Sequence, residues 1–201
     1  MAPQTATATT GGRMPPASQR ARRERILDVA MELAAEGGYD AVQMREVADR
    51  ADVALGTLYR YFPSKVHLLI AALGRTFSEL QASVPVAGAD GTAEERVYRV
   101  VAAVTRYLAK NRRLSGAMIR ALMSADAEAG REVDAVGDVM VGFIAAVTHE
   151  PDGVASERDT LIAHIIGKVW LSDVVTFLSG RMTISAVLDD LEATIALVMS
   201  N

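Results

Sequence analysis

Apolar residues recur at helical spacing along almost the whole chain, and no stretch shows the sustained alternation of a β-strand. In the first such stretch, Ile26, Ala30, Leu33 and Ala34 share one helix face. Gly37-Gly38 ends it, because glycine tolerates the left-handed backbone of a helix terminus. The pattern predicts an all-α fold, with one helix that begins after Thr92 and others over residues 18–36, 44–51, 54–61, 64–83, 114–123, 127–148, 156–180 and 185–200.

Two helix starts carry capping signals. Pro63 cannot continue the preceding helix, and Ser64 is placed to accept a hydrogen bond from the first turn of the next one. Thr92 and Glu95 have the spacing of a capping box, in which each side chain accepts from the other residue's amide. The stretch 85–91 before that box is predicted to be a loop.

The last two predicted helices are apolar on more than one face. Over residues 156–180 the apolar positions occupy too much of the circumference for one buried stripe: Leu161, Ile162, Ile165, Ile166, Val169, Trp170, Val174, Val175, Phe177 and Leu178. One face can pack on its own subunit while another packs on a partner, and closed two-fold dimers are the commonest oligomers. The pattern favours a homodimer; a central helix surrounded by its own chain is the alternative.

Residues 44–61 form two short helices joined by a tight turn at Asp52-Val53. This is the arrangement of a helix-turn-helix, whose second helix enters the major groove of DNA, although any small helical hairpin shares its outline. We divide the chain into a disordered tail (1–17), a DNA-binding head (18–65) and a helical body (66–201). The helix over 64–83 is predicted to be the only element that touches both head and body.

The distribution of charge is compatible with a nucleic-acid partner, although the net charge is −4. Residues 1–80 hold ten Lys/Arg and nine Asp/Glu, whereas residues 81–201 hold eleven and sixteen. Residues 13–25 carry five arginines against Glu24 alone. Basic charge therefore gathers in an arm that leads into the first helix, on an acidic body.

Cysteine is absent, which excludes disulfides and thiolate metal sites and fits a cytoplasmic protein. The longest uncharged apolar stretch, 139–149, spans 11 residues, well short of the roughly 20 that cross a bilayer. We therefore predict a soluble cytoplasmic protein without a membrane partner. Met14 offers an alternative start of the chain.

The helix-turn-helix resembles that of the TetR family of transcriptional repressors. The resemblance is carried by Gly38-Tyr39, by residues 44–48 and, most specifically, by the run Gly-Thr-Leu-Tyr-Arg-Tyr-Phe-Pro-Ser-Lys over 56–65. It implies a nine-helix subunit with a ligand pocket in the body, and a homodimer formed through the last two helices. A two-fold dimer implies a palindromic operator in double-stranded DNA.

Resemblance and residue chemistry together select the predicted DNA contacts: Arg45, Leu55, Gly56, Thr57, Tyr59, Tyr61 and Lys65, with Arg20, Arg22 and Arg23 in the arm. Gly56 lets backbone approach DNA closely, and the hydroxyls suit phosphates and base edges. Lys65 suits a phosphate, and Arg45 suits guanine O6 and N7. The alternatives are a pair between Arg45 and Asp49, a solvated Lys65 and a solvated charged face for the arm. Leu58 and Phe62 are predicted to be core.

Large apolar residues of the body are the candidate ligand contacts, with plain core as the alternative: Met118, Leu122, Met123, Met140, Phe143, Trp170, Val174 and Phe177. Residues 42–45, 111–133 and 169–172 resemble those of TetR-family repressors of steroid (cholesterol) catabolism in actinobacteria. That resemblance implies a large apolar effector, a steroid-derived acyl-CoA; an unrelated apolar molecule is the alternative. The cations Arg106, Lys110, Arg112 and Arg113 could meet CoA phosphates, but offsetting a helix C-terminus is the preferred interpretation.

Two other classes of function compete with a regulator. An enzyme is disfavoured because His67, His149 and His164 are scattered and no nucleophile elbow or phosphate-binding glycine loop occurs. We predict no catalytic residue, cofactor or metal. A non-specific architectural DNA-binding protein would coat DNA through a broad basic surface, and the acidic body argues against it.

Overall fold

The computed structural model describes residues 16–83, 91–148 and 155–200. Residues 1–15 of the predicted tail, with Met14, and most of the predicted loop 85–91 lie outside these ranges. Within them the chain forms nine α-helices, one 3-10 turn and no strand, as the all-α prediction requires. The helices are α1 (Pro16–Ala41), α2 (Met44–Arg50), α3 (Leu55–Tyr61), α4 (Lys65–Ser83), α5 (Ala93–Lys110), α6 (Arg112–Met123), α7 (Gly130–Thr148), α8 (Glu157–Leu178) and α9 (Ile184–Met199), with the 3-10 turn η1 (Ala127–Ala129) before α7.

Most helix ends lie within two residues of the predicted bounds. Helix α1 begins at Pro16, two residues early, and Gly38 breaks it with a φ of 73° before a last turn that ends at Ala41. The capping box is present: the Thr92 amide donates to Glu95 at 3.0 Å, and the Glu95 amide donates to the Thr92 hydroxyl at 3.3 Å. The Ser64 hydroxyl lies 3.5 Å from the His67 amide and caps α4.

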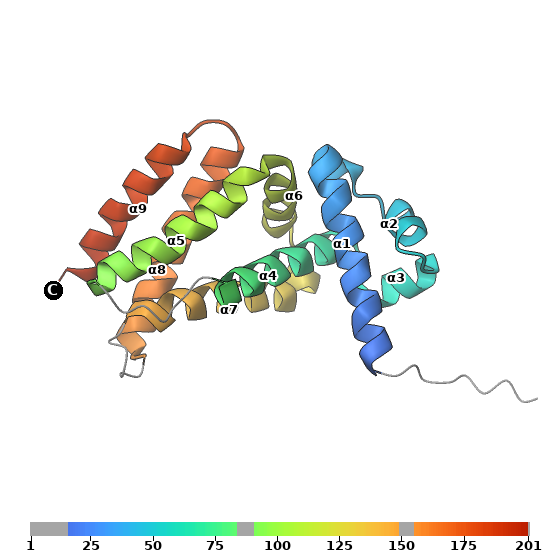
Figure 1. Cartoon of the computed structure of the whole chain (residues 1–201), viewed down its shortest axis with the longest axis horizontal. Helices are drawn as coiled ribbons and strands as arrows, with labels where there is room; N and C mark the ends of the chain where they lie inside the picture. The colour runs from blue at the N-terminus through green and yellow to red at the C-terminus, as the bar shows by residue number, and fades with distance from the viewer. Residues whose placement is uncertain (1–15, 84–90, 149–154, 201) are drawn as a thin grey trace, which may run out of the picture.

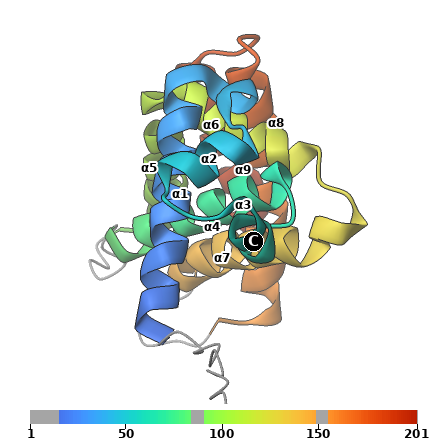
Figure 2. The same cartoon turned by 90° about the vertical axis from the view of Figure 1, so that its right-hand side faces the viewer.

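The helices form a small head and a larger body joined by two elements. Figure 1 shows α1, α2 and α3 at one end and α5, α8 and α9 at the other, and Figure 2 shows the head from its own end. Helix α4 packs on α1 in the head and on α6 and α7 in the body. Arg75 of α4 reinforces the first contact, since its guanidinium pairs with Glu24 at 3.1 Å and Asp28 at 2.8 Å in α1.

The prediction that α4 alone touches both parts is wrong. Helix α6 packs along α1 as well as against α4 and α8. Its Arg113 donates to the Glu36 carbonyl of α1 at 2.8 Å, and its Arg120 pairs with Asp40 at 3.3 Å. The periodicity of α6 marked only its apolar face, whereas these links come from polar residues on its other side. Two helices of the body therefore hold the head.

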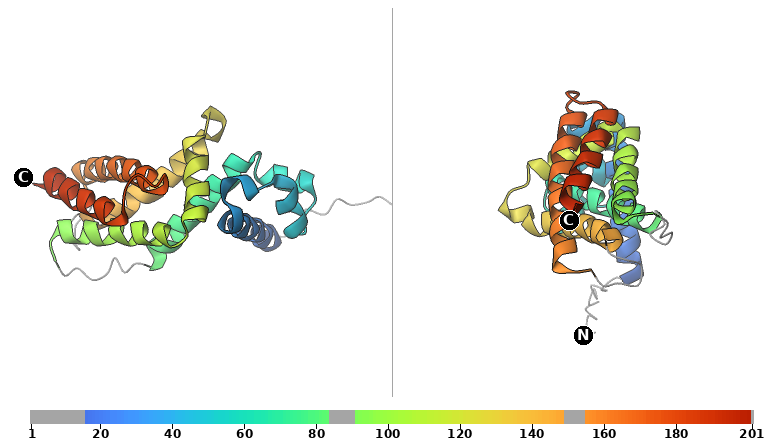
Figure 3. Two further views of the ribbon diagram at one scale, coloured as in Figure 1. Left: turned by 90° about the horizontal axis from the view of Figure 1, so that it is seen from above. Right: turned by 90° about the vertical axis from the view of Figure 1, so that its left-hand side faces the viewer.

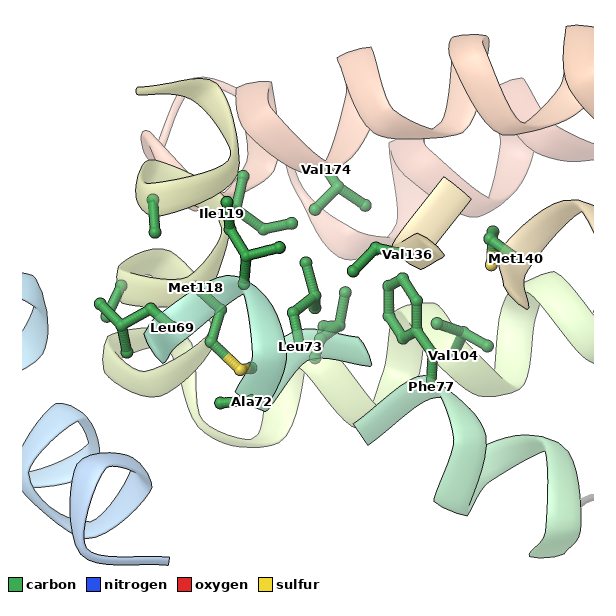
Figure 4. Packing of buried hydrophobic residues seen from close by; sticks show 14 of the residues in the cluster. Leu69, Ala72, Leu73, Phe77, Val104, Met118, Ile119, Val136, Met140 and Val174 are labelled. Atoms are coloured by element: carbon green, nitrogen blue, oxygen red, sulfur yellow. The ribbon is translucent and has the colours of Figure 1, made fainter. Parts of the chain in front are cut away.

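One hydrophobic core runs from the head through α4 into the body. Leu58 and Phe62 are buried, as predicted, and Leu68, Leu69 and Leu73 of α4 continue the cluster. In Figure 4 the Phe77 ring points from α4 toward Val136, and Met140 lies one turn further along α7. Because head and body share packed side chains, a shift of α4 cannot be confined to one of them.

Helix α8 is long and apolar enough to cross a membrane by length and composition alone, with a mean hydropathy of 1.6 over its most apolar window. The search for uncharged stretches did not select this helix, because Lys168 and Asp173 interrupt its apolar run. In the structure α8 packs against α7 and α9, but only 33% of that window is buried. Figure 3 shows α8 and α9 together at the end of the body away from the head.

Candidate DNA-binding surface and ligand pocket

The turn between α2 and α3 is tight because of its local backbone. Asp52 adopts a positive φ of 51°, which Asp tolerates better than most residues, and the Val53 amide returns to the Ala48 carbonyl at 3.0 Å. The Arg25 Nε of α1 donates to the Ala51 carbonyl at 2.9 Å and satisfies the end of α2. Leu58 is completely buried, so α3 has one fixed orientation on the head. These features define a helix-turn-helix.

The outward side of α3 carries several of the predicted contacts. Tyr59 is 46% exposed, Gly56 is exposed with open space where a Cβ would stand, and Thr57 is half-buried. Leu55 and Tyr61 are half-buried and pack against the core, so they offer less surface to DNA.

Arg60, which was not among the predicted DNA contacts, is an exposed cation in the last turn of α3 and forms no ion pair within the described part of the chain. The signal for Arg60 was its place between two tyrosines of the 56–65 run.

Arg45, in the first turn of α2, is exposed and forms no ion pair with Asp49 or any other carboxylate in the described ranges. Arg50, at the other end of α2, pairs with Glu46 at 2.7 Å and with Glu36 at 3.4 Å. Arg45 is therefore left available for an external acceptor, as guanine recognition needs.

The three predicted arm arginines lie in the first turns of α1, within the helix predicted over residues 18–36. Arg20 is exposed and Arg22 half-buried. Arg23 is engaged inside the head, since its guanidinium lies 5.4 Å from the centre of the Phe62 ring and 3.6 Å from the Glu24 carboxylate. Of the three, Arg20 has the most freedom to reach DNA.

Lys65 is neither freely solvated nor directed away from the protein. Its Nζ donates to the Tyr39 carbonyl at 3.2 Å and lies 4.1 Å from the centre of the Tyr39 ring. The side chain is thus held against the end of α1.

The body contains an apolar cavity of about 360 Å³ between α4, α6, α7 and α8. Four predicted ligand contacts lie on its wall: Leu122, Met123, Met140 and Trp170. The Trp170 ring is fixed there, because its Nε1 donates to the Thr105 hydroxyl at 2.8 Å and the ring lies 6.0 Å from that of Phe77. The other four predicted residues, Met118, Phe143, Val174 and Phe177, are buried in the core cluster and do not line this cavity.

The cavity has wall residues that sequence reasoning did not select. Phe77, Ile119, Val136 and Leu171 are apolar, so only the arrangement of helices could separate them from ordinary core. His164 and Lys168 are exposed and line the same cavity from α8. These two residues are the polar groups at the rim of the cavity. The sequence signal for them was their i, i+4 spacing, which places both on one face of α8.

The preferred interpretation of the cationic cluster fits three of its four members. Lys110 is exposed in the last turn of α5. Arg113 caps α1 through Glu36, and the Arg112 guanidinium donates to the Phe177 carbonyl near the end of α8 at 2.7 Å. These three cations therefore offset the C-termini of α5, α1 and α8. Arg106 is exposed on α5, one turn before Lys110.

A helix-turn-helix head with free polar and cationic side chains, packed on a helical body that holds an apolar cavity, defines a ligand-responsive DNA-binding transcriptional regulator. The model of bacterial regulatory proteins of the tetR family matches residues 26–72, and that of the tetracyclin repressor-like C-terminal domain matches residues 91–198. The chain belongs to the TetR family, and it is a regulator and not an enzyme.

Known relatives place the chain near one group of repressors. It is 45% identical to the HTH-type transcriptional repressor KstR of Mycolicibacterium smegmatis over 183 residues, which cover 90% of this chain and 89% of that protein. It is also 45% identical to KstR of Mycobacterium tuberculosis over 187 residues, 92% of this chain and 83% of that protein. A crystal structure of a TetR transcriptional regulator from Rhodococcus sp. RHA1 superposes with a TM-score of 0.84 at 31% identity, covering 92% of this chain and 98% of that one.

Proposed function

We propose that the protein is a cytoplasmic homodimeric repressor that binds a palindromic operator and is released by a steroid-derived acyl-CoA. The observation that carries the ligand switch is the position of the apolar cavity, because two of its walls, α4 and α6, also hold the head. A ligand that moves either helix therefore moves the head, and with it α3, the second helix of the helix-turn-helix (the recognition helix). The steroid-derived class rests on the resemblance to repressors of steroid catabolism, which the 45% identity to KstR supports.

The homodimer is supported by the surface of α8 and α9. Leu161 and Ile165 are 59% and 39% exposed on α8, and Leu197 is 79% exposed on α9. The two helices lie side by side at one end of the body. Large exposed apolar side chains on two neighbouring helices are typical of a protein interface.

The ligand class is supported by the size and chemistry of the cavity. Its volume of about 360 Å³ falls in the range of small-molecule sites, and its walls are apolar except for His164 and Lys168. An apolar steroid skeleton fits such walls, and the ammonium of Lys168 at the rim suits an anionic group of CoA.

The experiment is a titration of operator affinity with three probes. They are a thioester between CoA and a carboxyl group on a steroid side chain (the steroid-side-chain acyl-CoA thioester), palmitoyl-CoA and free CoA. Operator DNA is first recovered by in vitro selection from a random pool. We expect the steroid thioester to weaken operator binding strongly, palmitoyl-CoA weakly and free CoA not at all. Release by none of them would reject the acyl-CoA class, and native mass spectrometry for a co-purified molecule would then identify a regulator that senses another apolar compound.

A further inference from the structure

Tyr39 lies where the head meets both linking helices. It follows the break at Gly38 and is half-buried against the core. The Lys65 Nζ of α4 lies 4.1 Å from the centre of its ring, and the Arg120 Cζ of α6 lies 4.3 Å from the same centre. One aromatic ring thus binds a cation from each of the two helices that connect head and body.

The contacts of Lys65 leave it able to bind a phosphate. A lysine ammonium has three N–H donors, and the Tyr39 carbonyl accepts one of them at 3.2 Å. Two donors remain. The ring and the carbonyl restrict a flexible four-carbon side chain before DNA arrives, so less conformational entropy is lost when a phosphate binds.

Arg120 supports the ring from the body. Its guanidinium contacts the Tyr39 ring and also pairs with Asp40, the next residue, at 3.3 Å. Its immediate neighbour Ile119, together with Leu122 and Met123 on the next turn, lines the apolar cavity. The same short segment of α6 therefore contacts the cavity on one side and Tyr39 on the other.

We propose that Tyr39 is a positioning residue for the phosphate contact of Lys65, and that Arg120 holds Tyr39 in place from α6. The inference rests on the proposed DNA contact of Lys65. Arg120, a body residue with no proposed DNA contact of its own, then contributes to the part of operator affinity that does not depend on DNA sequence.

The test is a set of double-mutant cycles with Lys65→Ala, measured as operator affinity over a series of salt concentrations. Tyr39→Leu removes the ring, Tyr39→Phe retains it, and Arg120→Ala removes the supporting cation. Arg113→Ala is the matched control, because Arg113 also links α6 to α1 but binds the Glu36 carbonyl and not Tyr39. Thermal melts and circular dichroism establish that each variant is folded.

We expect Tyr39→Leu and Arg120→Ala each to weaken binding about two- to fivefold, the range of an exposed cation–π contact, and Tyr39→Phe to bind like the wild type. Lys65→Ala should reduce the magnitude of the salt slope by about one. In the Lys65→Ala background, Tyr39→Leu and Arg120→Ala should have no further effect, whereas any effect of Arg113→Ala should be unchanged.

Two results overturn the inference and can be told apart. If Lys65→Ala alters neither affinity nor salt slope, the phosphate contact itself fails and the positioning role fails with it. If Lys65→Ala behaves as expected but the effects of Tyr39→Leu and Arg120→Ala add to it in full, the DNA contact stands and Tyr39 does not act through Lys65. A Tyr39→Leu variant that is unfolded leaves the decision to the exposed Arg120→Ala, which removes no buried side chain.

Discussion

Arg45 belongs to the helix before α3, the recognition helix, and Lys65 to the helix after it. The two residues differ in how much freedom the protein leaves them. Arg45 has no partner carboxylate in the described ranges, whereas Lys65 is held by Tyr39. A free, planar guanidinium can align with two acceptors on a guanine edge, while a restrained ammonium suits the uniform row of phosphates.

Replacing Arg45 by alanine should therefore relax discrimination at one base position, at a cost of about 1–3 kcal/mol for the preferred base. Lys65→Ala should weaken all sequences by a similar factor. A panel of operators with single base-pair substitutions, titrated with each variant, measures both effects. Uniform loss across the panel for Arg45→Ala would contradict base recognition by this residue.

Asp173 of α8 is a residue whose charge is poorly accommodated. Its Oδ2 is buried without a hydrogen-bond partner within the described chain, and burial together with the nearby Asp190 carboxylate raises its pKa above 3.8. A raised carboxyl pKa means that the folded state binds more protons than the unfolded state around and above pH 3.8, so stability falls as pH rises through the folded pKa.

Asp173→Asn should accordingly raise the melting temperature at neutral pH, because an amide avoids the desolvated charge. The gain should shrink as the pH falls toward 3.8, where the wild-type carboxyl also becomes protonated. Thermal unfolding of both proteins across this pH range measures the difference. A gain that is independent of pH would show that ionisation of Asp173 is not its cause.

At the residue scale, the sequence could predict a feature of a side chain only where its cause lies within a few residues along the chain. Burial of Leu58 and Phe62 follows from helical spacing, and the capping box at Thr92 lies within four residues. Tyr39, which holds Lys65, and Phe62, whose ring lies near Arg23, are 26 and 39 positions away along the chain, and only the packing of helices brings these pairs together. No periodicity could have predicted that Lys65 is held by a carbonyl.

At the scale of elements, the helices were predictable and their mutual contacts were not. Hydrophobic spacing located every helix, because each has an apolar face. The contact between Arg113 and Glu36 joins residues 77 positions apart, and the apolar pattern of α6 says nothing of it. The same limit explains why half of the predicted ligand contacts are core: a cavity is a property of four helices together.

Helix α7 offers a direct test of the cavity. Gly137 lines it, and a Cβ at this position would meet no atom within 4 Å. Gly137→Leu should fill part of the cavity and abolish the response to ligand while operator binding persists. Stability should rise by roughly 0.5–1 kcal/mol, since glycine is a poor residue inside a helix.

Gly142→Leu is the matched control for this variant. Gly142 also lies in α7 with open space around it, but it does not line the cavity. Its replacement should give the same gain in helix stability and leave the ligand response intact. The measurements are chemical denaturation and release of the operator by the steroid-side-chain acyl-CoA thioester. Equal ligand responses in both variants would place the ligand elsewhere.

For the whole molecule, the proposed interface on α8 determines whether two heads act together. Leu161→Glu and Ile165→Glu place charges in the proposed interface and should yield monomers by sedimentation at micromolar concentration. A monomer reaches one half-site, so operator affinity should fall by about 10²–10⁴-fold through lost avidity. Ala146→Glu, on the exposed side of α7, should leave the dimer intact. Dimers in all three variants would exclude this face as the interface.

The coupling between cavity and head must also be reciprocal. A dimer fixes the spacing of its two recognition helices, and the half-sites of an operator lie about 34–36 Å apart or a multiple of that. A ligand can therefore release the DNA only by favouring a different spacing of these helices. The ligand must then bind the DNA-free arrangement more tightly, and operator DNA must weaken ligand binding by the same factor, typically about 5–150-fold. Calorimetry of the steroid-side-chain acyl-CoA thioester, with and without saturating operator, measures this factor from the ligand side. Tight binding that operator DNA leaves unchanged would mean that α4 and α6 tolerate the ligand without moving the head, and the cavity would then be a binding site but not a switch.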